Sequence, residues 1–287
     1  MQTKKIPASK NANSSGISKS KKYNPKRTKI PKQFKLTNAG HILGSTQLIA
    51  QTQEFGKLVY TGDFKLTDGL TTKSAKIEKC DTLIIECTYG NSNTTFPNPQ
   101  EVYEQMHKWH KQNKSNIQLW GGYATGKAQE LIKFLNKYAD QTPIVPKKVA
   151  EISQKYKQNG VKLDFICADS YEAKELMRDE FCAVFPPHNL TQSFAWQIAQ
   201  AHKKRTKVAI ATGWTGLRRT SADISFPLSD HADFSQILKY VQESQAKKVY
   251  LAHGKNEHTA KKLQQNKINA KSIEQINKKR ESAQSIL

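Results

Sequence analysis

The chain has 287 residues, of which 46 are Lys or Arg and 24 are Asp or Glu, so its formal charge is +22, and 37% of its residues are hydrophobic. This length is enough for one large domain or two ordinary ones with a substantial core. No stretch approaches the roughly 20 consecutive apolar residues of a membrane-spanning helix, and no apolar run follows the charged N-terminus as it does in a secretory signal. We therefore expect neither a transmembrane protein nor a secreted one, and no membrane partner.

The positive charge is concentrated at the two ends of the chain. Residues 1–35 contain eleven Lys or Arg and no acid, and residues 255–287 contain eight basic residues and three acids. The ends therefore carry +11 and +5, which leaves +6 for the 219 residues between them. Residues 1–32 have almost no large apolar side chain. They are predicted to be a disordered basic arm, because such a segment cannot offset its ordering entropy by burial.

Four cysteines occur without a CxxC pair or a regular spacing: Cys80, Cys87, Cys167 and Cys182. This pattern predicts small buried residues in a reducing interior, not disulfides or metal ligands. We therefore expect a cytoplasmic protein.

From Gln33 the sequence changes to short runs typical of β-strands. The predicted strands are Phe34–Thr37, Gln47–Gln51, Lys57–Tyr60 and Thr82–Glu86. Gly and Asp between these runs are typical of tight connections, so we expect successive antiparallel strands.

From Asn91 to about Arg219, predicted strands and helices alternate. The strands are Ile117–Trp120, Leu163–Ala168, Ala183–Phe185 and Lys207–Thr212. The helices are Gly126–Tyr138 and the segments near 147–158, 170–180 and 191–203. In the first helix, apolar residues recur at i, i+3, i+4 and i+7, which predicts one face against a core. The alternation is typical of a parallel sheet flanked by helices.

The last part of the sequence returns to a strand, a helix and a strand. After a run at Ile224–Leu228, a helical spacing of apolar residues appears at Phe234, Ile237, Leu238 and Val241. The predicted strand Lys248–Ala252 follows, and a Lys-rich helix and tail close the chain. This order predicts one domain interrupted by an inserted α/β domain.

Five short clusters place a His, Asp or Glu where a predicted strand ends, four of them in a turn that contains Gly. Their central residues are His41, Asp63, Glu86, His231 and His253. Strand ends hold side chains rigidly beside open loops, so they are good positions for ligands. Each residue alone is typical of an ordinary turn. Together they offer imidazole and carboxylate donors, which predicts a site for a hard to borderline metal ion.

The clusters occur in the order GHILGS, YTGDF, ECTYG, GKAQEL, SDHADF and HG. This order resembles the metallo-β-lactamase-fold nucleases of the β-CASP group, which includes RNA 3′-end processing nucleases and exonucleases associated with DNA ligases. The resemblance implies an α/β fold, namely a metallo-β-lactamase-like αββα sandwich with incomplete N-terminal strands and an inserted β-CASP α/β domain. The implied parts are the arm 1–32, a first sandwich part 33–90, the insertion 91–219, a second sandwich part 220–270 and a basic C-terminal tail 271–287.

The resemblance also implies roles for single residues. His41 corresponds to a ligand of a first Zn²⁺, Asp63 to a carboxylate that bridges two Zn²⁺ ions, and His253 to a ligand of the second. Glu86 and His231 correspond to an acid and an imidazole that act as a catalytic pair beside the scissile phosphate. The implied reaction is two-metal hydrolysis of a phosphodiester.

Nucleic-acid-binding residues are predicted at Gly126, Lys127, Gln129, Arg218 and Arg219. The first three open a predicted helix, where backbone N–H groups and a lysine can receive a phosphate. The same three residues are also typical of a helix cap with exposed polar side chains. Five aromatic residues are candidates either for stacking on bases or for the core: Trp109, Trp120, Tyr123, Trp196 and Trp214.

The sequence departs from the family in one respect. The family's HxHxDH motif, which contributes ligands to both Zn²⁺ ions, is absent, and residues 1–40 contain no His, Asp, Glu or Cys. His107 and His110 are expected on an exposed helix and do not replace it. Three explanations stay open: a non-catalytic relative that binds nucleic acid, a site completed by a partner subunit, and a truncated or misassigned start.

Two functions therefore stand side by side. The first is a zinc-dependent nuclease of the RNA-processing type, as in mRNA 3′-end processing, with a ligase-associated DNA exonuclease as its close competitor. The second is a non-catalytic module that holds RNA or single-stranded DNA through its basic ends, with an affinity that falls steeply with salt. For the arm, a solvated tail that only aids solubility is a third interpretation. The expected protein partner is a second copy in a homo-oligomer or a completing subunit.

Overall fold

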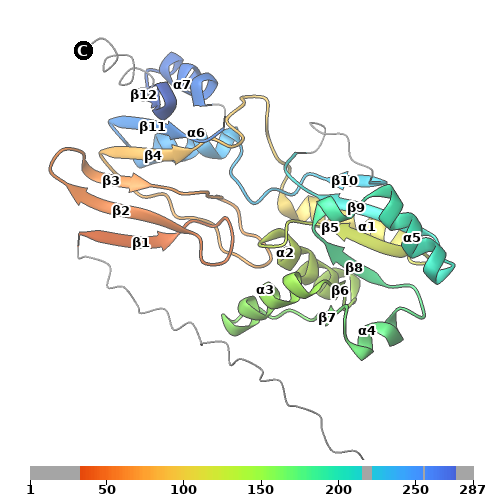
Figure 1. The fold of residues 1–287 in the computed structure, drawn as a ribbon. Coiled ribbons are helices and arrows are strands. Elements are labelled where there is room, and N and C mark those ends of the chain that lie inside the picture. Colours follow the sequence, from red (N-terminus) through yellow and green to blue (C-terminus); the bar gives the residue numbers. More distant parts are fainter. Residues whose placement is uncertain (1–32, 215–221, 255, 276–287) are drawn as a thin grey trace, which may run out of the picture. The chain divides into compact units, whose positions relative to one another are not determined.

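The computed structural model describes residues 33–214, 222–254 and 256–275. These residues form two six-stranded sheets with helices packed beside them, which confirms the predicted α/β class (Figure 1). No helix in the described ranges is long and apolar enough to cross a membrane. The predicted arm 1–32, the predicted nucleic-acid-binding residues Arg218 and Arg219, and most of the predicted basic tail lie outside the described residues.

The first sheet is built from both ends of the described chain. In spatial order its strands are β1 (Phe34–Asn38), β2 (Thr46–Thr52), β3 (Gly56–Tyr60), β4 (Thr82–Glu86), β11 (Lys248–Ala252) and β12 (Ala270–Ser272). The pairs β1–β2 and β2–β3 are antiparallel, as predicted. The expectation that β4 continues this antiparallel series is wrong, because β4 pairs parallel with both β3 and β11. The segment 61–81 runs back to the start of the sheet, as a parallel pairing requires.

The second sheet lies entirely between β4 and β11 in the sequence. In spatial order its strands are β10 (Ile224–Phe226), β9 (Thr206–Ala211), β5 (Ile117–Gly121), β8 (Cys182–Phe185), β6 (Ile144–Val145) and β7 (Ile166–Cys167). Each of its strand pairs is parallel, as the alternation of strands and helices predicts. The strand predicted over Leu163–Ala168 is shorter than expected, because only β7 within it forms ladder hydrogen bonds.

Seven α-helices occur in the described ranges. They are α1 (Pro99–Gln112), α2 (Lys127–Phe134), α3 (Lys147–Gln158), α4 (Tyr171–Leu176), α5 (Gln192–His202), α6 (Phe234–Ser244) and α7 (Asn256–Gln265). α2 continues into a π-helical turn, Leu135–Ala139, so the single helix predicted there has two parts. A 3₁₀ turn occupies Pro187–Asn189. The side chain of Asp233 caps α6 by accepting a hydrogen bond from the backbone N–H of Gln236, which fixes where this helix begins.

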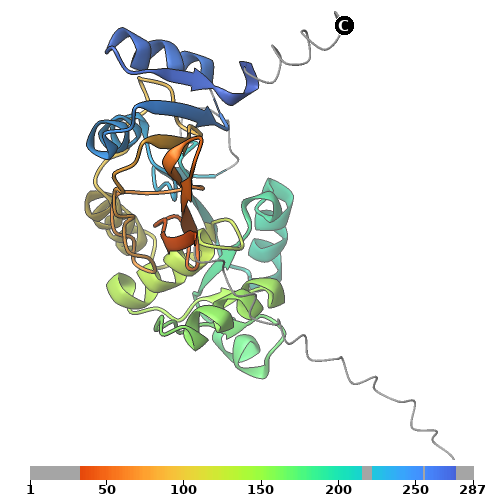
Figure 2. The same ribbon diagram turned by 90° about the vertical axis from the view of Figure 1, so that its left-hand side faces the viewer.

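The two faces of the first sheet differ in how they are covered. Four apolar side chains in register across β2, β3, β4 and β11 are buried together with side chains of α6 and α7: Ile49, Val59, Leu83 and Val249. Their neighbours in the next register row point to the opposite face and are only half-buried: Leu48, Tyr60, Ile84 and Tyr250. Figure 2 shows α6 on one side of this sheet. We call the half-buried side the open face.

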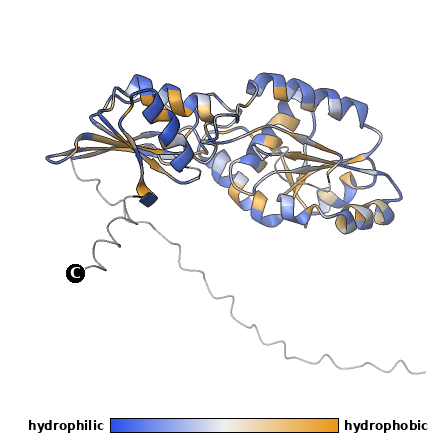
Figure 3. Ribbon diagram, turned by 90° about the horizontal axis from the view of Figure 1, so that it is seen from above, coloured by the Kyte–Doolittle hydropathy of each residue, from blue (hydrophilic) through white to orange (hydrophobic). Residues whose placement is uncertain are grey.

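The second sheet is covered on both sides (Figure 3). One core cluster contains Trp109 and Trp120, whose rings meet edge-on with centres 5.1 Å apart, so these two candidates for base stacking belong to the core. Tyr123 and Trp196 instead remain 54% and 63% exposed. The expectation that His110 lies on an exposed face is wrong, because it is 3% exposed and its Nδ1 donates to Gln118 at 2.9 Å.

The four cysteines are free thiols. Cys87 and Cys182 are buried as predicted, whereas Cys80 and Cys167 are only half-buried. Burial raises the pKa of the Cys80 thiol to about 11, so this sulfur stays protonated at neutral pH.

Candidate metal centre and active site

Three of the predicted site residues meet between the two sheets. His41, Asp63 and His231 each offer one ligand atom, and these atoms lie within 4.8 Å of one another. Nε2 of His41 is 4.0 Å from Oδ2 of Asp63, and the imidazole ring centres of His41 and His231 are 4.4 Å apart. We call these residues the three-ligand group.

The loop of His41 is fixed against the loop of Asp63 by a close backbone approach. Gly40 bridges to Phe64 and has a φ of 77°. A Cβ atom at Gly40 would lie 2.5 Å from the carbonyl oxygen of Lys65. Both the positive φ and this lack of space therefore require glycine. The hydroxyl of Ser45 accepts a hydrogen bond from the backbone N–H of His41 and closes the loop.

Hydrogen bonds set the orientation of both imidazoles. Nδ1 of His41 donates to the carbonyl oxygen of Asp230 at 3.1 Å, and Nδ1 of His231 donates to Oε1 of Glu86 at 2.9 Å. With the proton on Nδ1, the Nε2 atom of each ring keeps a lone pair. Metal-binding histidines commonly have this arrangement, in which a carbonyl or carboxylate holds the second ring nitrogen.

Glu86 is fully buried at the end of β4. Its carboxylate accepts hydrogen bonds from the backbone N–H groups of Phe64 and Thr88, at 3.2 and 2.9 Å, as well as from His231. Burial alone would raise the pKa of Glu86, but the bonds from His231 and Thr88 outweigh it and hold the pKa below its usual value. Burial would likewise lower the pKa of His231, and Glu86 raises it instead. The two residues therefore form the acid–imidazole pair that the sequence predicts.

The donors of the three-ligand group suit zinc. Two imidazole nitrogens and one carboxylate oxygen match the three protein ligands typical of a catalytic Zn²⁺ site. Residues 33–214, 222–254 and 256–275 contain no second group of this kind. His253 lies outside the group, exposed at the end of β11 with a φ of 60°, so its assignment to a second Zn²⁺ stays a prediction.

Lys127 lies in an unexpected place. Its side chain is 2% exposed, and its Nζ donates to Oε2 of Glu130 and to Oδ1 of Asp230, both at 2.6 Å. Gln129 is also buried, and its Oε1 accepts from the backbone N–H of Gly126 at 2.8 Å. Gln129 therefore caps α2, as the alternative interpretation predicts, but the expectation that these polar side chains are exposed is wrong. Their predicted phosphate contact gains no support either, because their polar groups already have partners inside the protein.

The same bonds connect α2 to the three-ligand group. Asp230 accepts from Lys127 through its side chain and from His41 through its carbonyl oxygen. On the other side, the hydroxyl of Tyr103 on α1 donates to Glu130. Our sequence reasoning missed Asp230 and Glu130, although the first precedes His231 directly and the second follows Lys127 by three residues, the spacing of a helical ion pair.

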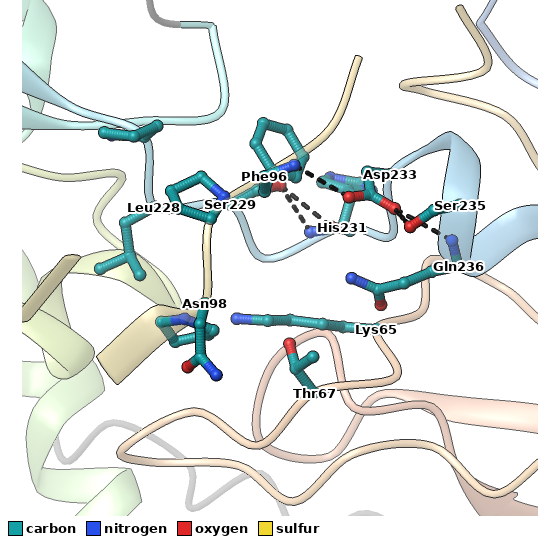
Figure 4. Close-up of a pocket in the computed structure, with 13 residues that line it drawn as sticks. Lys65, Thr67, Phe96, Asn98, Leu228, Ser229, His231, Asp233, Ser235 and Gln236 are labelled. Atoms are coloured by element: carbon teal, nitrogen blue, oxygen red, sulfur yellow. Dashed lines mark hydrogen bonds between the residues drawn. The ribbon is translucent and has the colours of Figure 1, made fainter. Parts of the chain in front are cut away.

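A pocket of about 220 Å³ opens beside His231. Lys65 is only 4% exposed and lines this pocket, and Figure 4 shows its side chain extending toward Asn98. Within the described residues the ammonium has no ion pair and no hydrogen bond. Burial lowers the pKa of Lys65, and the nearby charge of Glu130 offsets this only in part. Lys65 was not predicted from the sequence, where its only signal is its position two residues after Asp63.

Comparison with known proteins identifies the last part of the fold. Residues 222–272 match the RMMBL family, described as the Zn-dependent metallo-hydrolase RNA specificity domain. This range contains His231 of the three-ligand group as well as β10, α6, β11 and β12.

Similar proteins are found in several organisms. The chain is 28% identical to a probable DNA ligase of Opitutus terrae over 83% of its own length and 23% of that protein. It is 34% identical to the probable RNase MJ4 of Methanocaldococcus jannaschii over 42% of this chain and 29% of that one. It is 37% identical to the transcription termination factor FttA of a Lokiarchaeum over 39% of this chain and 19% of that protein. The matches thus span less than a third of each relative's length.

A solved structure supports the fold. A protein of unknown function from Enterococcus faecalis V583 superposes with a TM-score of 0.54, covering 79% of this chain and 59% of that one at 12% identity. Three findings confirm the resemblance that the motifs indicate. They are the RMMBL match, the RNase and ligase relatives and the two-sheet architecture. The chain is therefore similar to the metallo-β-lactamase-fold nucleases of the β-CASP group.

Proposed function

We propose that this chain is a metal-dependent phosphodiester hydrolase that acts on RNA, of the RNA-processing type. The observation that carries the proposal is the three-ligand group with the buried Glu86–His231 pair beside it. When bound, Zn²⁺ supplies Lewis-acid stabilisation of the phosphodiester oxygens and activates water. The proposal includes two Zn²⁺ ions, and His253 would hold the second.

The protein groups have separate tasks in this reaction. His41 and Asp63 hold the metal, and Asp63 is the proposed bridging ligand. Glu86 holds the Nδ1 proton of His231, so the lone pair on Nε2 can bind the metal; with a second proton on Nε2, the imidazolium would instead be able to protonate the leaving oxygen. Lys65 supplies a positive charge from its pocket for the anionic backbone of the substrate.

RNA is favoured over DNA by the description of the matched RMMBL domain and by the name of the probable RNase among the relatives. A ligase-associated DNA exonuclease is the competing activity, supported by the longest of the reported matches. A non-catalytic module that binds RNA or single-stranded DNA is the second candidate, because three ligands are the minimum for a catalytic zinc site. Three further predictions stay part of the proposal. They are a homo-oligomer or a completing subunit, the five-part domain division and a cytoplasmic location.

The test uses the purified chain with Zn²⁺ or Mn²⁺ and end-labelled single-stranded RNA and DNA. We expect metal-dependent cleavage of RNA that stops when the metal is removed with a chelator. A protein that takes up no metal and cleaves neither substrate would reject the hydrolase for this chain and leave the binding module. Faster cleavage of DNA would favour the ligase-associated activity.

Metal content separates the ligands from their neighbours. Asp63→Ala removes a carboxylate of the three-ligand group, so we expect it to empty the site, as measured by bound zinc per protein. Glu86→Ala removes only the partner of Nδ1 on His231 and is expected to weaken zinc binding by about 10- to 100-fold without abolishing it. Equal loss of zinc in both variants would contradict these roles.

A further inference from the structure

An aromatic pocket of about 300 Å³ adjoins the three-ligand group. Both imidazoles, His41 and His231, line it together with the rings of Tyr89, Tyr123 and Trp214. Its volume lies at the lower end of the roughly 300–1,000 Å³ typical of sites for small molecules. The pocket can therefore take a planar ring system, but not a folded polymer.

Tyr123 is the aromatic side chain of this pocket that is most open to solvent. It lies between β5 and α2 and is 54% exposed, whereas Tyr89 is 4% exposed and forms the floor with the ring of Trp214, 4.9 Å away. Trp109 and Trp120 of the same α/β region are packed in the core. Tyr123 is thus an aromatic face held at the mouth of a pocket, available to a ligand ring.

The lysine of this pocket offers no free charge to a phosphate. Lys127 lines it, but its ammonium is bonded to Asp230, which also lines it, and to Glu130. The positive charge is therefore neutralised within the protein. The lysine whose side chain has no partner among the described residues, Lys65, lines the other pocket. An uncharged aromatic ligand fits these walls better than an anion.

We infer that this pocket binds an unpaired nucleobase, stacked on Tyr123, from the nucleotide next to the scissile phosphodiester. The inference rests on the proposed function, because a phosphodiester at the three-ligand group places its neighbouring bases beside the pocket. Stacking on an aromatic ring accepts any base. A base that is paired inside a duplex cannot enter, so the substrate is single-stranded at the site of cleavage.

Binding without metal tests the inference independently of hydrolysis. The probe is a fluorescein-labelled tetrauridylate, titrated with the full chain in EDTA and followed by anisotropy. Stacking contributes roughly 1–3 kcal/mol per base, so Tyr123→Ala should weaken binding by about 5- to 160-fold. Tyr123→Phe keeps the ring and should stay within about twofold of the wild type. Tyr171→Ala is the matched control, because Tyr171 is 73% exposed on α4 and does not line the pocket.

A second probe identifies the base as the contact. Tetranucleotides are prepared with one abasic position each. The wild type should bind only one of them more weakly than the intact tetranucleotide, and Tyr123→Ala should cause no further loss of affinity for that one. The inference is overturned if Tyr123→Ala binds like Tyr171→Ala, or if no abasic position matters to the wild type. A wild type that shows this Tyr123 dependence but cleaves nothing with Zn²⁺ would reject the hydrolase and keep the pocket. If the wild type cleaves RNA and Tyr123→Ala does not change the cleavage, the hydrolase stands and the base-binding pocket is rejected.

Discussion

Lys127 shows how a buried charge can be held by its neighbours. Its ammonium lies between the carboxyl groups of Glu130 and Asp230, at 2.6 Å from each. Removing one member of a buried ion pair leaves an uncompensated charge, which typically costs about 3–5 kcal/mol. We therefore expect Lys127→Met to lower the free energy of unfolding by about that amount, as measured by urea denaturation.

The control for this variant is Lys148→Met, which removes an exposed lysine from α3. Substitutions at such surface positions usually change the free energy of unfolding by less than about 0.5 kcal/mol. If Lys127→Met were as stable as the control, the ammonium would not be needed to pair the two carboxylates. Zinc binding should also weaken in Lys127→Met, because Asp230 orients His41 through its carbonyl oxygen.

Glu130 gives this cluster a pH dependence. Burial alone would raise the pKa of Glu130, but the charges of Lys127 and Lys65 outweigh it and lower the pKa to about 2 from an ordinary 4.5. A lowered pKa in the folded state means that the ionised carboxylate stabilises the fold above pH 4.5, and that this contribution is lost as the pH falls toward 2.

Glu130→Gln should therefore be clearly less stable than the wild type at pH 7, and the difference should shrink steadily below about pH 4.5. Urea denaturation at pH 7, 5, 4 and 3 measures it. A difference that stays constant over this range would show that the charge of Glu130 plays no part.

Elements with a clear local pattern were predictable from the sequence. β1, β2, β3, β11 and α3 lie within a residue or two of their expected bounds, because alternation or helical spacing determines them locally. The pairing of β4 was not predictable in this way. Its apolar run fits either direction, and its parallel partner β11 lies far away in the sequence. The short β12 carries too few residues to show a pattern.

The two faces of β4 offer a direct comparison within one strand. Leu83 is fully buried on the covered face, whereas Ile84 is half-buried on the open face. Leu83→Ala should cost about 2–5 kcal/mol of unfolding free energy, and Ile84→Ala about 1 kcal/mol, since only part of its surface is removed from water. Urea denaturation of the two variants measures the contrast. Equal costs would mean that the open face is covered in the protein in solution.

At the scale of the whole molecule, the site is an assembly of distant segments. The motifs allowed us to predict that His41, Asp63, Glu86 and His231 belong to one site, because each stands at a strand end, and the structure brings these side chains close together. The burial of Lys127 and the roles of Asp230 and Lys65 were not predictable, because they arise only where the two sheets meet. Local sequence reports the chemistry of a side chain, but not which distant group will neutralise it.

The basic N-terminal arm allows a prediction that needs no structure. Residues 1–32 contain ten Lys or Arg and no acid. Each lysine that neutralises a phosphate releases counterions, so affinity for a long RNA should fall steeply with salt. Deleting residues 1–32 should make this dependence shallower, as measured by RNA binding between about 50 and 200 mM salt. An unchanged slope would assign the salt dependence to other residues. Binding of the short tetrauridylate probe should be affected least by the deletion.

The pairing of β4 with β11 has a consequence for the order in which the chain can fold during synthesis. β1 to β4 leave the ribosome first, and every residue of the second sheet follows before β11 appears. Until then β4 is an unpaired edge on one side, a template for pairing with other chains. The second sheet, with its parallel β–α–β connections complete within itself, can fold meanwhile as a separate unit. His231 follows the second sheet in the sequence, so the three-ligand group can form only after that sheet has been synthesised.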